Sequence, residues 1–146
     1  ITFTNTQTAG LWGFIQITDV DIRQVMGAYA IAPIRQVGLK PSTGTAATSV
    51  TNYLLSPRSP GNIVVAAFAH AANEATAPGT GMTELADQAN ADGALEVSWS
   101  NAAYTARPAA SWATSTALFG SVVVEVAAPN NEIFYPDPVG LLYQGV

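Results

Sequence analysis

Charged side chains are scarce in this sequence: 10% of its residues are Asp, Glu, Lys or Arg, against about 25% in an ordinary soluble domain. Ten acidic and five basic residues give a net charge of −5. The basic residues are scattered along the chain, so the sequence predicts no nucleic-acid partner. With so little charge to keep copies apart, we expect much of the surface to be covered in a larger assembly.

Three further features are missing. The chain has no cysteine, which excludes disulfides and cysteine-ligated metal sites. Its longest uncharged apolar run is about ten residues and contains His70, too short to cross a bilayer as a helix, so we expect no membrane partner. Helical periodicity is nearly absent. The one candidate, Ala69–Ala77, has no apolar stripe and ends at Pro78-Gly79, which favours a loop.

Short strands separated by Gly, Pro, Asn and Ser are what the chain does contain. The clearest, Ile63–Ala69, is apolar at both alternating sets of positions, so neither of its faces suits free solvent. About nine such strands with regular turns predict an all-β fold, an antiparallel, jelly-roll-like β-sandwich. The other predicted strands are Ile1–Asn5, Trp12–Val20, Gln24–Ile31, Ile34–Leu39, Thr48–Leu55, Met82–Gln88, Ala94–Ser100, Ala110–Thr114 and Ser121–Ala127.

Domain boundaries follow from where this alternation stops. We predict a sandwich domain over residues 1–128, in which residues 1–35 are either the end of a preceding module or a hairpin that completes the sheet. After Pro129 the period is lost and prolines recur, so residues 129–146 are predicted to form an extended arm. The arm must bury a set of large apolar side chains: Phe134, Tyr135, Leu141, Leu142 and Tyr143.

Catalytic and metal-binding patterns are weak. His70 is the only histidine, and no nucleophile motif accompanies it, so we expect no catalytic residues. A metal ligand at His70 is less favoured than a strand-end histidine bonded to a loop carbonyl. The run Asp87 to Gly93 suits a hairpin turn better than a calcium loop. Asp19 and Asp21 suit solvation at a strand end better than a cation site or an acid/base pair. We therefore expect no cofactor and no metal.

Glu125 stands in the apolar strand SVVVEVA. It is either a buried carboxylate with a raised pKa or a group that faces solvent or meets an arginine such as Arg35 or Arg107; we favour the second alternative.

Tryptophans offer a different function. Trp99 shares the parity of Leu95 and Val97 and is expected to point into the core. Trp12 and Trp112 border predicted turns, where an exposed ring can stack on a sugar, and they are candidate glycan platforms. Packing in the core or at an interface is the favoured alternative for each.

One stretch resembles a known group of proteins. The segments SPGNIVVAAFAHAANEATAPGTGMTELADQ, ALEVSWSNA and ASWATSTALFGSVVVEVA, within Ala46–Ala128, are similar to β-sandwich modules of bacteriophage virion structural and decoration proteins. Met82 stands where tryptophan is common in that pattern, and the segment after Pro129 has no counterpart in it. The resemblance implies a structural role in a virion, as a capsid decoration or cement protein or as a head or tail fibre component, without enzymatic activity.

The predicted function is therefore structural, through contacts with capsid or tail proteins and with copies of the chain in a homo-oligomer. The alternative is a carbohydrate-binding, lectin-like surface module that uses Trp12 or Trp112.

Overall fold

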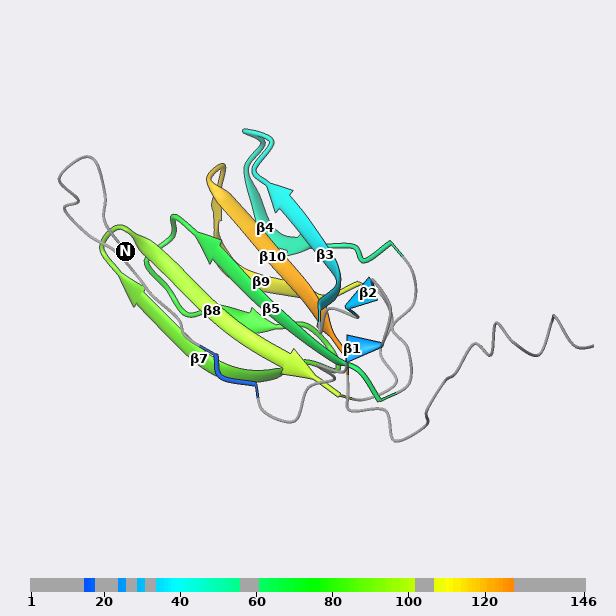
Figure 1. Ribbon diagram of the computed structural model, residues 1–146. Helices are drawn as coiled ribbons and strands as arrows, with labels where there is room; N and C mark the ends of the chain where they lie inside the picture. Colours follow the sequence, from blue (N-terminus) through cyan, green and yellow to red (C-terminus); the bar gives the residue numbers. More distant parts are fainter. Residues whose placement is uncertain are drawn as a thin grey trace, which may run out of the picture.

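The computed structural model describes residues 15–17, 24–25, 29–30, 34–55, 61–101 and 107–127. In this part of the chain two antiparallel sheets lie on each other, and it contains no helix (Figure 1). The predicted all-β sandwich is therefore confirmed.

The larger sheet has five strands in the order β3-β10-β5-β8-β7. Small residues and β-branched residues at alternating positions let these strands pack on both faces. Their bounds are Ile34–Pro41 (β3), Phe119–Val126 (β10), Ile63–His70 (β5), Gly93–Ser100 (β8) and Thr83–Asn90 (β7).

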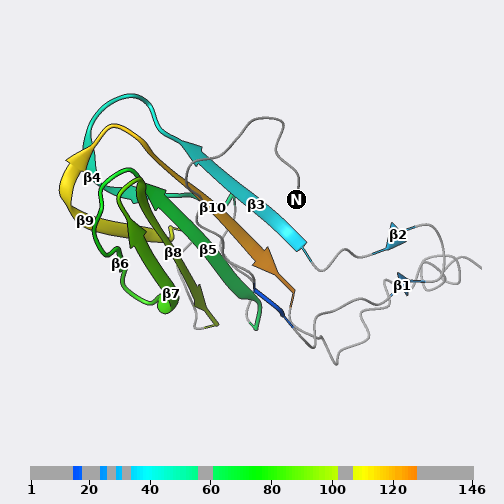
Figure 2. The ribbon, with the colours of Figure 1, turned by 90° about the vertical axis from the view of Figure 1, so that its left-hand side faces the viewer.

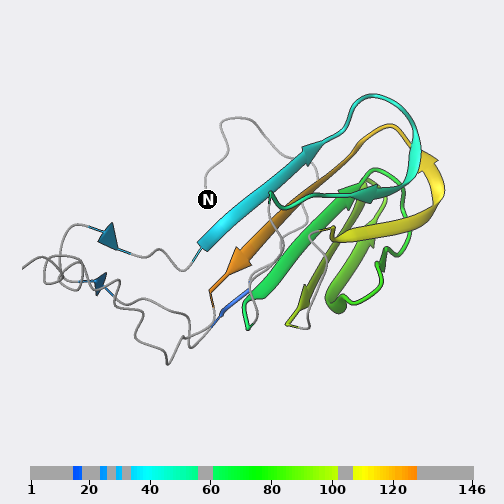
Figure 3. The ribbon, with the colours of Figure 1, turned by 90° about the vertical axis from the view of Figure 1, so that its right-hand side faces the viewer.

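The smaller sheet has three strands in the order β4-β9-β6: Ala47–Thr51, Ala109–Thr116 and Ala77–Pro78. Pro78 lies in the edge strand β6, where its missing N–H costs no ladder hydrogen bond. The connections β3–β4 and β9–β10 both pass from one layer to the other (Figures 2 and 3). Because β3 pairs with β10 and β4 with β9, the two connections travel together along one side of the sandwich.

The core fills the space between the layers. Val64, Ala66 and Phe68 of β5 are fully buried there, and Trp112 of β9 meets them from the opposite layer. The other members of the core cluster are Val50, Leu54, Ala72, Met82, Ala110 and Val123, with Phe119 packed against it.

A glycine is required where β3 approaches the loop after β4. A Cβ at Gly38 would lie 2.7 Å from both Asn52 Oδ1 and the carbonyl oxygen of Tyr53. Asn52 uses this closeness: its Nδ2 donates to Gly38 O at 3.1 Å and to Ser121 Oγ at 3.0 Å. One buried amide therefore ties β3 and β10 to the end of β4.

Most predicted strands from residue 34 onward are present, with shifted ends. The Gln24–Ile31 prediction is wrong in extent, because the described residues there form two short strands, β1 (Gln24–Val25) and β2 (Tyr29–Ala30), that pair with each other. The predicted strands Ile1–Asn5 and Trp12–Val20 lie outside the described residues except for 15–17, which form no strand. The predicted arm, 129–146, also lies outside them.

Candidate interaction surface

The five-stranded sheet has two faces because side chains alternate along each strand. One face packs on the smaller sheet and is called the inner face here. The residues on the opposite side, called the outer face, stand opposite one another across the ladders. They form three rows: Val37, Val124, Val65, Trp99 and Thr83; Leu39, Val122, Ala67, Val97 and Ala86; Pro41, Gly120, Ala69, Leu95 and Gln88.

None of these outer-face residues is charged. Of the two cations of β3, Lys40 pairs with Ser121 on the inner-face register, and Arg35 is the extra residue of a bulge, since the pairing with β10 passes from Gln36 directly to Ile34. A sheet face meant for solvent normally alternates to polar residues. This face has the composition of a surface that another layer covers.

Coverage of the outer face is uneven. At β8, Val97 is only 5% exposed, and the segment 15–17 lies on this side of the sheet (Figures 1 and 2). At β3 and β10 the side chains are open: Leu39 is 70% exposed, Val37 49% and Val122 42%. We call these three residues the open strip.

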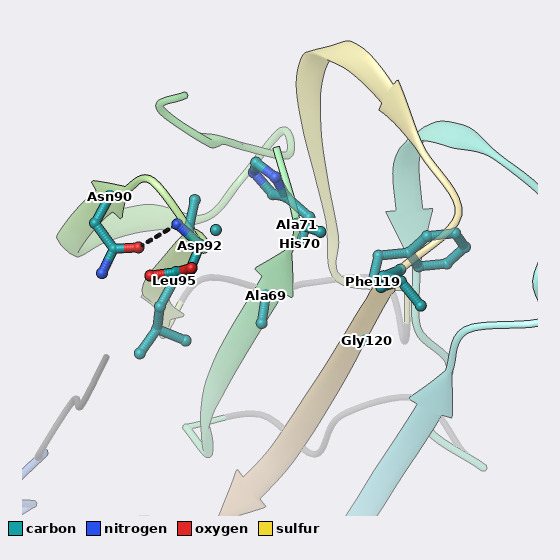
Figure 4. Close-up of a pocket in the computed structure, with 11 residues that line it drawn as sticks. Ala69, His70, Ala71, Asn90, Asp92, Leu95, Phe119 and Gly120 are labelled. Atoms are coloured by element: carbon teal, nitrogen blue, oxygen red, sulfur yellow. Dashed lines mark hydrogen bonds between the residues drawn. The ribbon is translucent and has the colours of Figure 1, made fainter. Parts of the chain in front are cut away.

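Two shallow hollows lie near the open strip, and the first is bordered by it. One, of about 490 Å³, is bordered by Leu39 and Val122 on one side and Leu95 on the other, with Ala67, Ala69 and Gly120 along its floor. The second, of about 450 Å³, lies between His70, the β7–β8 turn and Phe119, as Figure 4 shows. Both are lined by Ala69, Leu95 and Gly120, so the two hollows adjoin, and we refer to them together as the groove.

Polar groups are placed on the inner face instead. At its β3–β10 side they are paired: Glu125, only 2% exposed, accepts from Nδ2 of Asn62 at 2.6 Å and from the side-chain amide of Gln36. Lys40 Nζ donates to the carbonyl oxygen of Thr51 at 2.9 Å. The favoured expectation that Glu125 faces solvent or meets an arginine is wrong on solvent, because the amides of Asn62 and Gln36 hold it inside.

At the β7–β8 side several inner-face polar groups lack hydrogen-bond partners. Glu96 is fully buried, and neither its carboxylate oxygens nor the hydroxyls of Ser98 and Ser100 have a partner, whereas Asp87 accepts from the Thr76 N–H at 3.1 Å. Burial raises the pKa of Glu96 to about 7, and the negative charges of Glu84 and Asp87 add to this. Glu96 therefore holds its proton far more readily than an exposed glutamate does.

His70 ends β5 inside the core. Its ring is 4% exposed, stacks on Trp112 with centroids 4.4 Å apart, and its Nε2 lies 2.9 Å from Thr76 Oγ1. Burial lowers the pKa of His70, an effect that the charges of Glu74 and Asp87 partly offset. Its Nε2 partner is the hydroxyl of Thr76, and the backbone of Ala72, in the loop after β5, also acts to raise the pKa of the ring. A buried, stacked imidazole with these contacts fixes the loop after β5.

The candidate glycan platforms fare differently. Trp112 is 6% exposed, with its Nε1 donating to Ala47 O at 3.1 Å, so the favoured alternative of packing in the core is confirmed there and the glycan platform is wrong. Trp12 lies outside the described residues, as do Phe134, Tyr135, Leu141, Leu142 and Tyr143 of the predicted arm.

Trp99 is also placed differently than expected. Its cross-strand partners are Val65 and Thr83, which puts it on the outer face, whereas Glu96, Ser98 and Ser100 face the core. In β8 the apolar residues Leu95, Val97 and Trp99 lie on the outer face, and the polar residues Glu96, Ser98 and Ser100 lie on the inner face. This is the reverse of the usual arrangement, so the alternation of apolar residues indicated the wrong face as the core.

The cation-site expectations can be checked in part. Asn90 pairs with Gly93 across a tight turn, and the Asp92 N–H donates to Asn90 Oδ1 at 2.9 Å (Figure 4), so the stretch is the predicted hairpin turn. Within residues 34–55, 61–101 and 107–127, no three acidic or histidine side chains gather as metal ligands. Asp19 and Asp21 lie outside the described residues.

The outer face of β3 and β10 is the candidate interaction surface that the sequence alone did not identify. Its signal is present in the sequence: Val37 and Leu39 share one parity in β3, and Val122 and Val124 share one in β10, with no charge at any of them. Only the pairing of β3 with β10 brings these positions together.

Comparison with protein-family models, with curated proteins and with solved structures gave no match. In the part of the chain that the structure describes, no helix has the length and apolar character needed to cross a membrane.

Proposed function

We propose that this protein is a structural component that works through protein–protein contacts made by the outer face of its five-stranded sheet. The observation that carries the proposal is the open strip: Leu39, Val37 and Val122 stand exposed in a face that has no charged residue. A contiguous, uncharged apolar patch on a single chain is typical of an interaction site.

The free energy available from the open strip is small, so a structural role through this surface requires many copies of the contact. Fully burying an aliphatic side chain yields about 1.5–3 kcal/mol, and the open-strip side chains are already partly covered, so together they supply roughly 3–5 kcal/mol. Association costs at least about 4 kcal/mol in lost translational and rotational freedom. The strip alone therefore gives a weak contact, which becomes firm when many copies bind side by side and raise one another's effective concentration.

A bacteriophage virion is the setting we propose for these contacts, with the chain acting as a capsid decoration or cement protein or as a head or tail fibre component. Support comes from the resemblance of residues 46–128 to virion β-sandwich modules and from the scarcity of charge, which suits a protein surrounded by others. The jelly-roll form is part of the same proposal, and the paired β3–β4 and β9–β10 connections support it.

The carbohydrate-binding alternative loses one of its two platforms, because Trp112 belongs to the core. No described residue replaces that ring as an exposed tryptophan: Trp99 is half-buried on the outer face. The alternative now depends on Trp12 alone, and glycan binding abolished by Trp12→Ala would restore it.

The proposal is tested by the self-association of the full chain, measured by sedimentation velocity over a concentration series. We expect association that Leu39→Glu weakens at least tenfold, because it places a charge in the middle of the uncharged face. Ala113→Glu is the matched control, since Ala113 is exposed on β9 of the smaller sheet. A monomer at every concentration, together with failure to bind isolated virion particles, would reject the proposed function.

A further inference from the structure

The groove on the outer face has a shape that selects its occupant. Its floor is low because Ala67, Ala69 and Gly120 have almost no side chain, and Leu39 and Leu95 rise on its two sides. Each of its two hollows, about 490 and 450 Å³, has room for one large side chain. A groove of this form fits an extended segment that projects bulky residues downward, as in the recognition of peptides by sheet surfaces.

The 490 Å³ hollow is almost wholly apolar, whereas Asp92, Asn90 and His70 border the 450 Å³ hollow. No carboxylate borders the 490 Å³ hollow, and its one cation, Lys40, directs its ammonium to the carbonyl oxygen of Thr51 at 2.9 Å. A segment seated in the 490 Å³ hollow therefore gains nothing there from a positive charge and loses nothing by carrying acidic residues outside it. The matching segment is apolar, contains aromatic rings and has no lysine or arginine.

This chain contains such a segment. Residues 129–146 have no basic residue and two acidic ones, Glu132 and Asp137, beside the aromatic pair Phe134-Tyr135. Pro136 and Pro138 fix their own φ angles and hold the residues before them in extended conformations, so the sequence favours an extended form around the aromatic pair. Nineteen residues follow Ala127 in the sequence and span up to about 60 Å when extended, more than twice the length of an eight-residue strand.

We propose that the groove binds the C-terminal segment Asn130–Val146 of a second copy of this chain, with the Phe134-Tyr135 pair seated over Ala67, Ala69 and Gly120. A segment from a second copy makes the outer face an interface between copies, as the proposed function requires, and Leu39 at the groove's border is 70% exposed. This inference rests on the proposed function, since it names the partner of the same outer face.

The exchange has a consequence for assembly. A copy that gives its arm to one neighbour and receives an arm from another forms a heterologous contact, which builds rings or extended arrays and not closed two-fold dimers. Burying the aromatic pair adds apolar area to that of the open strip, so the exchanged segment offsets more of the cost of association than the open strip does alone.

Disulfide trapping tests the proposal cleanly because the chain has no cysteine of its own. One preparation carries Ala69→Cys and a second, distinguishable by an added mass tag, carries Tyr135→Cys. The two are mixed as full chains and oxidised mildly. The control replaces the first preparation with Ala113→Cys, another exposed alanine in a strand but on the opposite side of the sandwich. We expect the mixed disulfide to form at least ten times faster with Ala69→Cys than with Ala113→Cys.

Each other outcome overturns the inference. Equal trapping rates at the two positions show that the segment does not seek the groove. A double variant, Ala69→Cys with Tyr135→Cys, that closes into a monomer at high dilution shows that the chain fills its own groove. If Leu39→Glu weakens association but no trapping occurs, the proposed function stands and only the occupant is wrong; if the chain never associates, both fail.

Discussion

The two faces of the five-stranded sheet differ in the charge of their side chains. The inner face, against the smaller sheet, carries Lys40, Glu84, Asp87, Glu96 and Glu125, whereas the outer face carries no charge. In a sandwich exposed to water the distribution is expected the other way round. The difference fits the proposal that the open part of the outer face, at β3 and β10, contacts another molecule, while the inner face is covered by the smaller sheet within the chain.

The buried polar groups of the inner face differ in whether they have hydrogen-bond partners. Near β3 and β10, Asn52 and Glu125 have hydrogen-bond partners, whereas near β7 and β8 Glu96, Ser98 and Ser100 have none. A buried polar group without a partner costs about 1–3 kcal/mol. Stability is therefore concentrated where β3, β10 and the end of β4 meet, beneath the open strip, and the β7–β8 side is the weaker part of the inner face.

The largest change in stability is expected for a substitution in the core between the two sheets. Trp112→Ala removes a buried ring that stacks on His70 and packs near Phe119. We expect a loss of about 3–5 kcal/mol in the free energy of unfolding, measured by urea denaturation. A loss below 1 kcal/mol would mean that the ring is exposed and would bring back the glycan-platform reading.

The second effect is a dependence on pH. The folded-state pKa of Glu96, about 7, is above its value of 4.5 in the unfolded chain, so its contribution to stability is complete below pH 4.5 and is lost as the pH rises through 7. In Glu96→Gln this loss is absent. We expect the variant's stability relative to wild type to rise by about 2 kcal/mol between pH 4.5 and pH 8.

At each pH, the free energy of unfolding of the variant is compared with that of wild type at the same pH. Because His70 is present in both proteins, its contribution cancels. Urea denaturation at a series of pH values measures the difference. A difference that is flat across this range would show that Glu96 is ionised in the folded protein or open to solvent.

Adjacent valines in β10 give the most closely matched test of the two faces. Val123 is fully buried on the inner face, and Val122, the preceding residue, is 42% exposed on the outer face. We expect Val123→Ala to lower the free energy of unfolding by about 2 kcal/mol and Val122→Ala by less than about 0.5 kcal/mol. For self-association we expect the reverse, with Val122→Ala weakening it more than Val123→Ala does. If Val123→Ala had the larger effect on both stability and association, the proposed distinction between the two faces would be wrong.

The sequence predicted the features that depend on neighbouring residues, and it did not predict those that depend on which strands pair. Alternation and turn residues predicted the strands β5, β8 and β10 and the all-β class, because both signals are local. The error at Trp99 arose because parity shows which residues share a face but not which face meets the second sheet. The open strip was missed for a related reason: Val37 and Val122 are far apart in sequence, and only the β3–β10 ladder makes them neighbours.

The most direct test of the central claim is a footprinting measurement of the outer face as the concentration of the full chain is raised. Radical labelling of Leu39 and Val122 is followed by mass spectrometry, with Leu55, 96% exposed and outside the outer face, as the internal reference. The account predicts that labelling of Leu39 and Val122 falls severalfold as copies associate while labelling of Leu55 stays constant. Labelling of Leu39 and Val122 that remains unchanged while the chain associates would contradict it.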